Sequence, residues 1–334
     1  MHIAHTKSSE QVADGVINGE TGDAEQGVQG AIPAQPTGMG KAFGAGQNGN
    51  QKGGKGGRRF DLIAGSELNR HVLPNLVHKT QLVEKGDKRT VLTASAGNHG
   101  QAIARAAAVF KIPCLVVVPT NAPKTKVDGI RSYGAELRLQ GPNYDEAEAW
   151  TLRQAENTAD YAFVSSYNDP LVIQGQGTLG FEILEQVPDV ASIVVPIGGG
   201  GLIAGTAAVV KQLRPGVRVI GVQAEASAAI YHSLKAGRMV TVPDLPSIAD
   251  GIAGNIDLST ITFPIIQKYV DDVVLVSEDA IKTAIQELLH REKLLAEGSA
   301  AAAYAAVTTG KVTAKGPIVA LITGGNIDPS YAKL

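Results

Sequence analysis

The 334-residue sequence contains a single cysteine, Cys114, so no disulfide can form within the chain. This cysteine lies in the apolar segment 112–118, where we expect a buried strand thiol because free cysteine is among the most buried residue types. The lack of disulfides fits a reducing, cytosol-like compartment. The N-terminus also lacks the apolar core of a signal peptide, so we expect a cytoplasmic protein.

Long apolar runs and a strong charge of either sign are missing as well. No segment reaches the roughly 18–20 apolar residues that a membrane span needs, so we expect no membrane partner. The formal net charge is −2, which gives no general basic surface for nucleic acid. The seven histidines have no spacing typical of a zinc site. The hydrophobic content of 44% is ample for a large core, and the length allows about two domains.

The chain changes character near residue 58. Residues 1–58 hold 14 of the 39 glycines and no sustained apolar periodicity, so we expect an atypical, Gly-rich, disordered N-terminal segment. Beyond it, strand-like and helix-like stretches alternate, which predicts an α/β fold with mainly parallel sheets. The strands are too many for one small sheet, so we expect a small domain over 89–170 and a large domain over 59–88 and 171–334. The expected strands are 90–93, 114–118, 161–164, 192–197, 217–222, 273–276 and 318–322, and the expected helices are 101–110, 124–133, 145–157, 202–210 and one after Ser277.

Four consecutive glycines, Gly198, Gly199, Gly200 and Gly201, separate a strand-like stretch from a helix-like one. Glycines permit positive φ and leave their amide N–H groups unshielded. Together with the positive end of the following helix, these groups make a site for an anion, most often a phosphate. The sequence therefore predicts a phosphorylated ligand at this glycine run.

A second strand-to-helix turn occupies residues 95–100. The Ser95 hydroxyl and the backbone N–H groups there would hold a carboxylate, and Asn98 offers both a donor and an acceptor. An ordinary Asn-His turn with a helix cap is the alternative interpretation. Further clusters, which we also expect to be ligand loops, occur at 174–178, 296–300 and 323–326. The last of these follows the final expected strand, at the edge where open α/β sheets bind ligands.

Together and in this order, these segments resemble the pyridoxal-phosphate enzymes of the threonine dehydratase and serine racemase family, which have fold type II. The resemblance covers roughly residues 88–334 and includes the segments 122–135, 143–147 and 248–251. It implies a two-domain α/β architecture, pyridoxal 5'-phosphate as the cofactor in the cleft between the domains, a small hydroxyamino acid as substrate, and a homodimer. The chain ends at Leu334, so we expect the length of a catabolic dehydratase, without a regulatory domain.

The resemblance also assigns roles by position. The glycine run would hold the cofactor phosphate, Asn98 would meet the 3-hydroxyl of the ring, and Thr323 would face the pyridine nitrogen. Gly251 and Glu297 would line the ring, although a helix-capping carboxylate is an equally good interpretation of Glu297. The residues that would bind the substrate carboxylate are Ser95, Asn98 and His99.

Some relatives bind a divalent cation near the sheet, and Glu225 and the Ala229 carbonyl match that site. Tyr231 stands where an Asp is expected in those relatives. A single carboxylate makes a weak site for Ca²⁺ or Mg²⁺, which prefer six or more oxygen ligands. The resemblance therefore supports a cation only weakly.

One position bears on the type of reaction. Racemases of the family carry a serine as a second base where this chain has Ala96, and alanine cannot move a proton. The resemblance thus implies an ammonia-lyase (dehydratase) that converts L-threonine or L-serine to a 2-oxo acid and ammonia by β-elimination. The alternatives are a serine or hydroxyaspartate racemase or dehydratase, and a catalytically inactive cofactor-binding homologue. A nicotinamide oxidoreductase is a more distant alternative, because the glycine run has no convincing acidic ribose partner ~20 residues on.

The Schiff-base lysine is where the sequence departs from the family pattern. The family places it in a Gly-Ser-Phe-Lys-x-Arg-Gly-Ala segment before the turn at residues 95–100, and no such segment occurs at that distance. The nearest match is 35–45, which contains Lys41, whereas 71–82 resembles the segment that normally precedes the lysine strand. Either Lys41 reaches the site from an atypical N-terminus, or the lysine segment is missing, or residues 1–58 are damaged or mistranslated. The weaker candidates are Lys79, Lys85 and Lys88.

Overall fold

The computed structural model describes residues 2–3, 60–64, 88–243 and 245–327. The lysine candidates Lys41, Lys79 and Lys85 lie outside the described residues, as does most of the N-terminal segment 1–58, whereas Lys88 is described and exposed. Within the described parts of the chain, no helix is long and apolar enough to cross a membrane.

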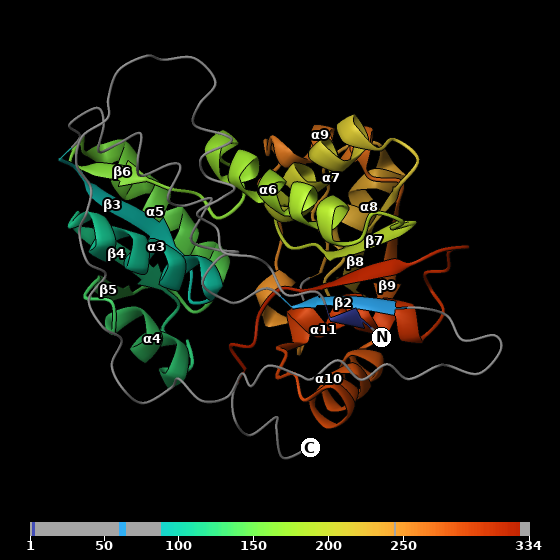
Figure 1. Ribbon diagram of the computed structural model, residues 1–334. Coiled ribbons are helices and arrows are strands. Elements are labelled where there is room, and N and C mark those ends of the chain that lie inside the picture. Colours follow the sequence, from blue (N-terminus) through green and yellow to red (C-terminus); the bar gives the residue numbers. More distant parts are fainter. Residues whose placement is uncertain (1, 4–59, 65–87, 244, 328–334) are drawn as a thin grey trace, which may run out of the picture. The chain divides into compact units, whose positions relative to one another are not determined.

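A four-stranded sheet is built from the first half of the described chain (Figure 1). Its strand order is β5-β4-β3-β6, and all neighbouring pairs are parallel. All five residues of β4 are buried, Cys114 among them, as expected of a strand whose two faces are both covered by helices. The four strands are β3 (Thr90–Ala94), β4 (Cys114–Val118), β5 (Glu136–Leu139) and β6 (Tyr161–Phe163).

Three helices cover this sheet on two sides. The side chains of Val91 and Val116 pack in one cluster with α3 (Asn98–Phe110) and α4 (Lys124–Arg131). The neighbouring residues Leu92 and Leu115 point to the other face and pack with α5 (Tyr144–Asn157). This alternation follows from the two-residue period of a strand.

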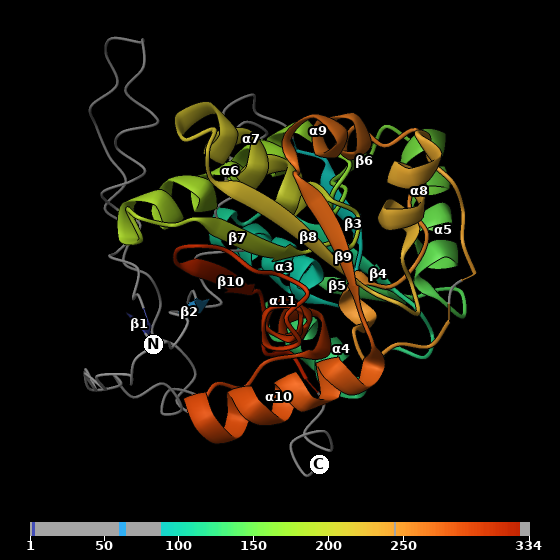
Figure 2. The ribbon, with the colours of Figure 1, turned by 90° about the vertical axis from the view of Figure 1, so that its right-hand side faces the viewer.

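A six-stranded parallel sheet has the order β1-β2-β10-β7-β8-β9. Figure 2 shows helices on both of its faces. Side chains on one face, such as Ile193, pack with α6 to α9, and those on the other face, such as Val194, pack with α10 and α11. The strands are β1 (His2–Ile3), β2 (Phe60–Ala64), β7 (Ser192–Pro196), β8 (Arg218–Ala224), β9 (Asp272–Val276) and β10 (Ile318–Ile322). The helices are α6 (Pro170–Gln186), α7 (Gly201–Leu213), α8 (Ala229–Ala236), the 3₁₀ turn η1 (Asp250–Ile252), α9 (Thr262–Tyr269), α10 (Glu278–Glu292) and α11 (Gly298–Thr308).

The predicted α/β fold with parallel sheets is confirmed, and the expected elements occur with small shifts at their ends. Ser277 caps α10 as predicted, because its hydroxyl accepts the N–H of Ala280. The expectation of a ligand loop at 174–178 is wrong, since these residues lie inside α6. Asp169 explains the early start of that helix, because its carboxylate accepts two N–H groups of the first turn and Pro170 follows at the first helical position.

The glycines of this region serve helix packing instead. Gly205 of α7 lies against α6, where an added Cβ would overlap the Ile173 carbonyl oxygen and lie 2.8 Å from the Gly177 nitrogen. The two helix backbones therefore approach each other so closely that Gly205 has no room for a side chain, and a Cβ at Gly177 would lie 2.9 Å from the Val209 side chain. Small residues at these positions reflect the packing of α6 on α7 and not a bound ligand.

We predict that Gly205→Ala destabilises the fold by about 1–3 kcal/mol, because overpacking a core costs that much and exceeds the gain in helix propensity. Gly216→Ala is the matched control, since a Cβ there would have no neighbour within 4 Å. Urea unfolding followed by circular dichroism measures both variants. Equal midpoints for the two would contradict the close approach of α6 and α7.

Candidate active site

The glycine run joins β7 to α7, as the sequence predicts. Of its four residues, Gly200 alone has a positive φ, +88°. The others are small because of their neighbours: a Cβ at Gly199 would overlap the ring of Tyr167, and one at Gly201 would lie 3.0 Å from the Tyr167 Cα. Among the described residues, no hydrogen-bond acceptor is paired with the N–H groups of the run. These groups and the positive end of α7 can therefore hold an anion.

A hydrogen bond joins the beginnings of two helices that belong to different sheets. Asn98, the first residue of α3, donates its side-chain N–H to Glu297 Oε1 at 2.9 Å. Glu297 precedes α11 and occupies its cap position, yet its carboxylate caps no N–H of that helix. The helix-capping interpretation therefore fits its place in the chain and not its side chain, which is turned toward Asn98.

Gly324 packs against this pair. Its carbonyl oxygen accepts the N–H of Glu297 at 3.0 Å. A Cβ at Gly324 would lie 2.6 Å from Glu297 Oε1 and would overlap Asn98 Nδ2. The turn 323–326, which carries Thr323 directly after β10, is thus brought to the two side chains that the sequence places beside the cofactor ring.

The predicted carboxylate-binding turn has defined hydrogen bonds. Ser95 Oγ accepts the N–H of Gly97 at 3.2 Å. His99 Nε2 lies 3.0 Å from Thr93 Oγ1, and that hydroxyl donates its own proton to the Val164 carbonyl at 2.8 Å. Since the threonine proton is used, His99 Nε2 must carry the hydrogen in this contact. The Nε2–H of His99 is therefore directed at Thr93, which fixes the orientation of the imidazole at the start of α3.

Two buried polar atoms near the turn 323–326 and the start of α11 have no hydrogen-bond partner among the described residues. They are Ser299 Oγ and Asn326 Nδ2. Ser299 lies behind Gly251, since a Cβ at that glycine would be 2.9 Å from the hydroxyl. An unpaired buried polar group costs about 1–3 kcal/mol, so both atoms suit a polar ligand that would pair with them.

The structure adds little support for a cation at Glu225 and Ala229. Glu225 follows β8 and is exposed, and Ala229 begins α8. The Lys235 ammonium lies 4.2 Å from the ring centre of Tyr231, the residue that replaces the expected Asp, so a positive charge already stands there. Within the described residues, no group of three or more His, Cys, Asp or Glu side chains is placed to hold a metal ion.

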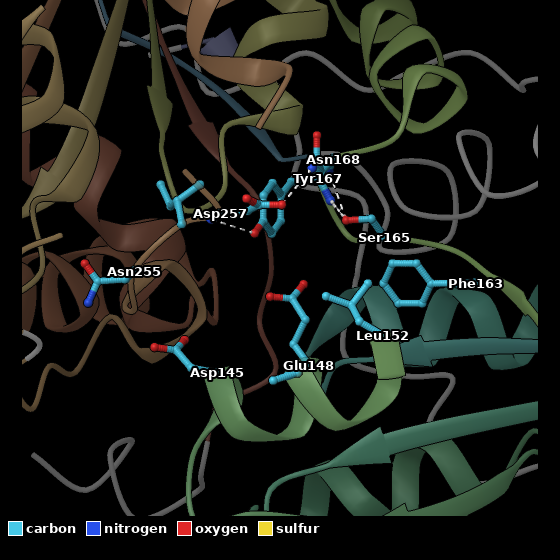
Figure 3. Close-up of a pocket in the computed structure, with 11 residues that line it drawn as sticks. Asp145, Glu148, Leu152, Phe163, Ser165, Tyr167, Asn168, Asn255 and Asp257 are labelled. Atoms are coloured by element: carbon cyan, nitrogen blue, oxygen red, sulfur yellow. Dashed lines mark hydrogen bonds between the residues drawn. The ribbon is translucent and has the colours of Figure 1, made fainter. Parts of the chain in front are cut away.

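A pocket of about 250 Å³, which the sequence did not indicate, lies beside the glycine run. Its wall includes Tyr167, whose ring occupies the space next to Gly199. Figure 3 shows the carboxylates of Glu148 and Asp257 on opposite walls, with Tyr167 near Asp257. The lining residues are Asp145, Glu148, Ala149, Leu152, Phe163, Ser165, Tyr167, Asn168, Asn255, Ile256 and Asp257. Only their assembly in three dimensions reveals this pocket, because they come from three separate segments.

Glu148 is the electrostatically unusual group of this pocket. Burial raises the pKa of its carboxyl, and the nearby carboxylates of Asp145 and Asp257 raise it further. The Tyr144 hydroxyl, which donates to Glu148 Oε1 at 2.8 Å, lowers it in part. Burial likewise raises the pKa of Tyr144 well above its usual value. The pocket therefore disfavours the charged form of Glu148 relative to water.

A family model described as "Pyridoxal-phosphate dependent enzyme" matches residues 70–324 of the chain. The chain belongs to this family. The family expected from the sequence is thereby confirmed, and pyridoxal phosphate is its cofactor.

Individual relatives agree with this assignment. L-threonine ammonia-lyase of Geobacter sulfurreducens is 48% identical over 239 residues, which are 71% of this chain and 59% of that protein. The chain thus spans about three fifths of that relative. Among solved structures, maize serine racemase has a TM-score of 0.74 and 30% identity, covering 80% of this chain and 82% of that one. The processed form of threonine deaminase isoform 2 from Solanum lycopersicum has a TM-score of 0.72 and 32% identity, covering 80% of this chain and 78% of that one. The fold is therefore that of the fold type II enzymes.

We predict that Glu148→Gln makes the protein more stable than the wild type at neutral pH, and that the difference disappears at acid pH. The raised pKa means that the folded state holds the proton more tightly than the unfolded state, so wild-type stability falls as pH rises above about 4.5. Gln keeps the acceptor for Tyr144 without this penalty. Urea unfolding from pH 4 to 8 measures the effect, with Glu185→Gln on the exposed face of α6 as control. Parallel pH profiles for wild type and Glu148→Gln would contradict it.

Proposed function

We propose that the protein is a pyridoxal-phosphate-dependent ammonia-lyase that converts L-threonine or L-serine to a 2-oxo acid and ammonia by β-elimination. The observation that carries the proposal is the contact of Asn98 with Glu297 and with the turn 323–326 after β10. The glycine run follows β7, the strand next to β10 in the same sheet. The carboxyl ends of parallel strands are where such sheets bind ligands. The 48% identity to an L-threonine ammonia-lyase supports the choice of reaction.

The described residues fit the cofactor. The unpaired N–H groups at Gly198 to Gly201 suit a phosphate. Asn326 Nδ2 is a buried donor that needs an acceptor, and the Ser299 hydroxyl can donate or accept. A phosphorylated aromatic ring with polar substituents matches this set of groups. We accordingly keep the roles expected for Asn98, Gly251, Glu297 and Thr323.

When bound, pyridoxal phosphate supplies an electron sink for the charge that develops at the substrate Cα. The chain's own residues bind and orient. The Ser95 hydroxyl and the N–H groups at the start of α3 would bind the substrate carboxylate, with His99 held beside them by Thr93. The Glu297 carboxylate orients the Asn98 amide, so that its oxygen and remaining N–H are presented in a fixed direction.

The side chain at position 96 favours elimination over racemisation. Ala96 lies in the turn between β3 and α3, and its methyl group packs with the core of the four-stranded sheet. A methyl group has no proton to exchange, so it provides no second base on that side of the substrate. Racemisation needs proton transfer on two faces, whereas elimination needs it on one.

We predict that the wild type forms a 2-oxo acid from L-serine without D-serine, and that Ala96→Ser adds D-serine formation because the hydroxyl supplies a second proton carrier. Chiral chromatography and a 2-oxo acid assay measure the two products. Ala108→Ser, at an exposed alanine of α3, is the control and is expected to change neither. Substantial D-serine formation by the wild type would favour the racemase alternative.

The lysine that bonds the cofactor decides between an active enzyme and an inactive cofactor-binding homologue. We propose Lys41, which lies outside the described residues. We predict that borohydride reduction of the full chain with pyridoxal phosphate labels Lys41, and that Lys41→Ala loses the label while Lys88→Ala keeps it. Peptide mapping by mass spectrometry measures the label. Label on another lysine would exclude Lys41, and the absence of any label would support the inactive homologue.

The proposal also includes the division into domains, the cellular location, the oligomeric state and a cation site. The two sheets suggest a small domain over 89–170 and a large domain over 59–88 and 171–334. The family resemblance suggests a cytoplasmic homodimer, which sedimentation analysis of the purified protein tests for its oligomeric part. A divalent cation at Glu225 and Ala229 remains a weaker prediction, and it requires that added Mg²⁺ or Ca²⁺ shift the melting temperature.

A further inference from the structure

We propose that Thr262 is a positioning residue that aims the Gly200 N–H at the bound anion. The inference rests on the proposed function, in which that anion is the cofactor phosphate. Thr262 is fully buried at the start of α9, and its hydroxyl donates to the Gly199 carbonyl oxygen at 2.8 Å. The bond reaches a loop 63 positions earlier in the chain, so it does not serve α9 itself.

A second threonine hydroxyl contacts Thr262. Thr260 Oγ1 lies 2.9 Å from Thr262 Oγ1 and accepts the Thr262 N–H at 3.3 Å. Each hydroxyl has one proton. Because a carbonyl oxygen can only accept, Thr262 gives its proton to Gly199. The single proton of Thr260 can go to Thr262 Oγ1 at 2.9 Å or to the Asn168 side-chain oxygen at 3.5 Å, and the shorter contact favours Thr262. The relay runs one way, from Thr260 through Thr262 to Gly199.

The fixed carbonyl determines where the next N–H points. The described chain has no cis peptide bond, so the C=O of Gly199 and the N–H of Gly200 point in opposite directions across one planar peptide. With the carbonyl turned to Thr262, the N–H is turned away from α9. Gly200 then takes φ +88°, and its own carbonyl accepts the N–H of Ala204 in α7. A peptide flip would therefore break the bond to Thr262 and remove a donor from the anion site.

Neighbouring contacts hold the relay in place. The side-chain oxygen of Asn168 accepts the N–H of Ile261 at 2.9 Å, which anchors the residue before Thr262. Tyr167, next to Asn168, presses its ring against Gly199. A Cβ at Gly200 would lie 3.0 Å from Thr262 Oγ1. The Gly199–Gly200 peptide is thus enclosed between Tyr167 and Thr262.

The test compares the affinities of the full chain for pyridoxal phosphate and for pyridoxal, which lacks the phosphate. We expect Thr262→Val to weaken pyridoxal phosphate binding about tenfold, the effect of one hydrogen bond to a charged group, and to leave pyridoxal binding unchanged. Thr262→Ser keeps the hydroxyl and is expected to restore the wild-type ratio. Thr151→Val is the matched control, because Thr151 is also fully buried and donates to a backbone carbonyl, that of Ala147, at 2.7 Å.

Fluorescence titration gives both dissociation constants, and circular dichroism checks that each variant is folded. If Thr262→Val fails to fold, Thr260→Val tests the same relay one step earlier, with a smaller selective loss expected. An unchanged affinity ratio in a folded Thr262→Val variant would overturn the inference while leaving the proposed function intact. A wild type that binds pyridoxal phosphate no more tightly than pyridoxal would overturn the phosphate site itself. Tight, phosphate-selective binding without 2-oxo acid formation would count against the proposed reaction alone.

Discussion

The hydrogen bond from Asn98 to Glu297 is the contact on which the candidate active site depends. It joins residues 199 positions apart, at the beginnings of two helices that cover different sheets. Glu297 is 9% exposed, so its charge is largely removed from water and needs the donor that Asn98 supplies. The absence of a side chain at Gly324 makes room for the pair. A second link, the ion pair of Lys126 with Asp250 at 2.6 Å, ends next to Gly251. Both links therefore end at or next to residues expected to line the cofactor ring, Glu297 and Gly251.

The glycines of the run at 198–201 show how one residue type meets two different demands. Gly200 needs its backbone freedom, since few L-residues adopt φ +88°. Gly199 and Gly201 have ordinary backbone angles and are small because Tyr167 occupies the adjoining space. From the sequence alone, conformational freedom and exposed N–H groups are expected to explain all four glycines. Close approach of a neighbouring residue is a tertiary effect that a run of identical letters does not reveal.

Sequence patterns within a few residues predict the strands and helices whose ends are set by neighbouring residues. The strand at Ile318–Ile322 has the predicted bounds, because a short β-branched run ends at a Thr-Gly-Gly turn. The cluster at 174–178 is predicted as a loop because glycine is typical of turns, and this prediction is wrong. Those glycines instead let α6 lie on α7, and the helix takes its start from Asp169, outside the cluster. The order of motifs along the chain was informative for the family, since it is independent of whether each motif is a loop or a helix.

The pocket at Glu148 and the relay at Thr262 illustrate what the sequence could not supply. Thr260 and Thr262 flank an isoleucine before an ordinary amphipathic helix, and nothing in that pattern indicates a contact with residue 199. The contact arises because α9 packs on α7, so that the start of one helix lies beside the start of the other. A hydroxyl in this position replaces water as the partner of a buried carbonyl, and the peptide's N–H is then available on the opposite side. The proposed phosphate site would thus be positioned by residues that do not contact the phosphate themselves.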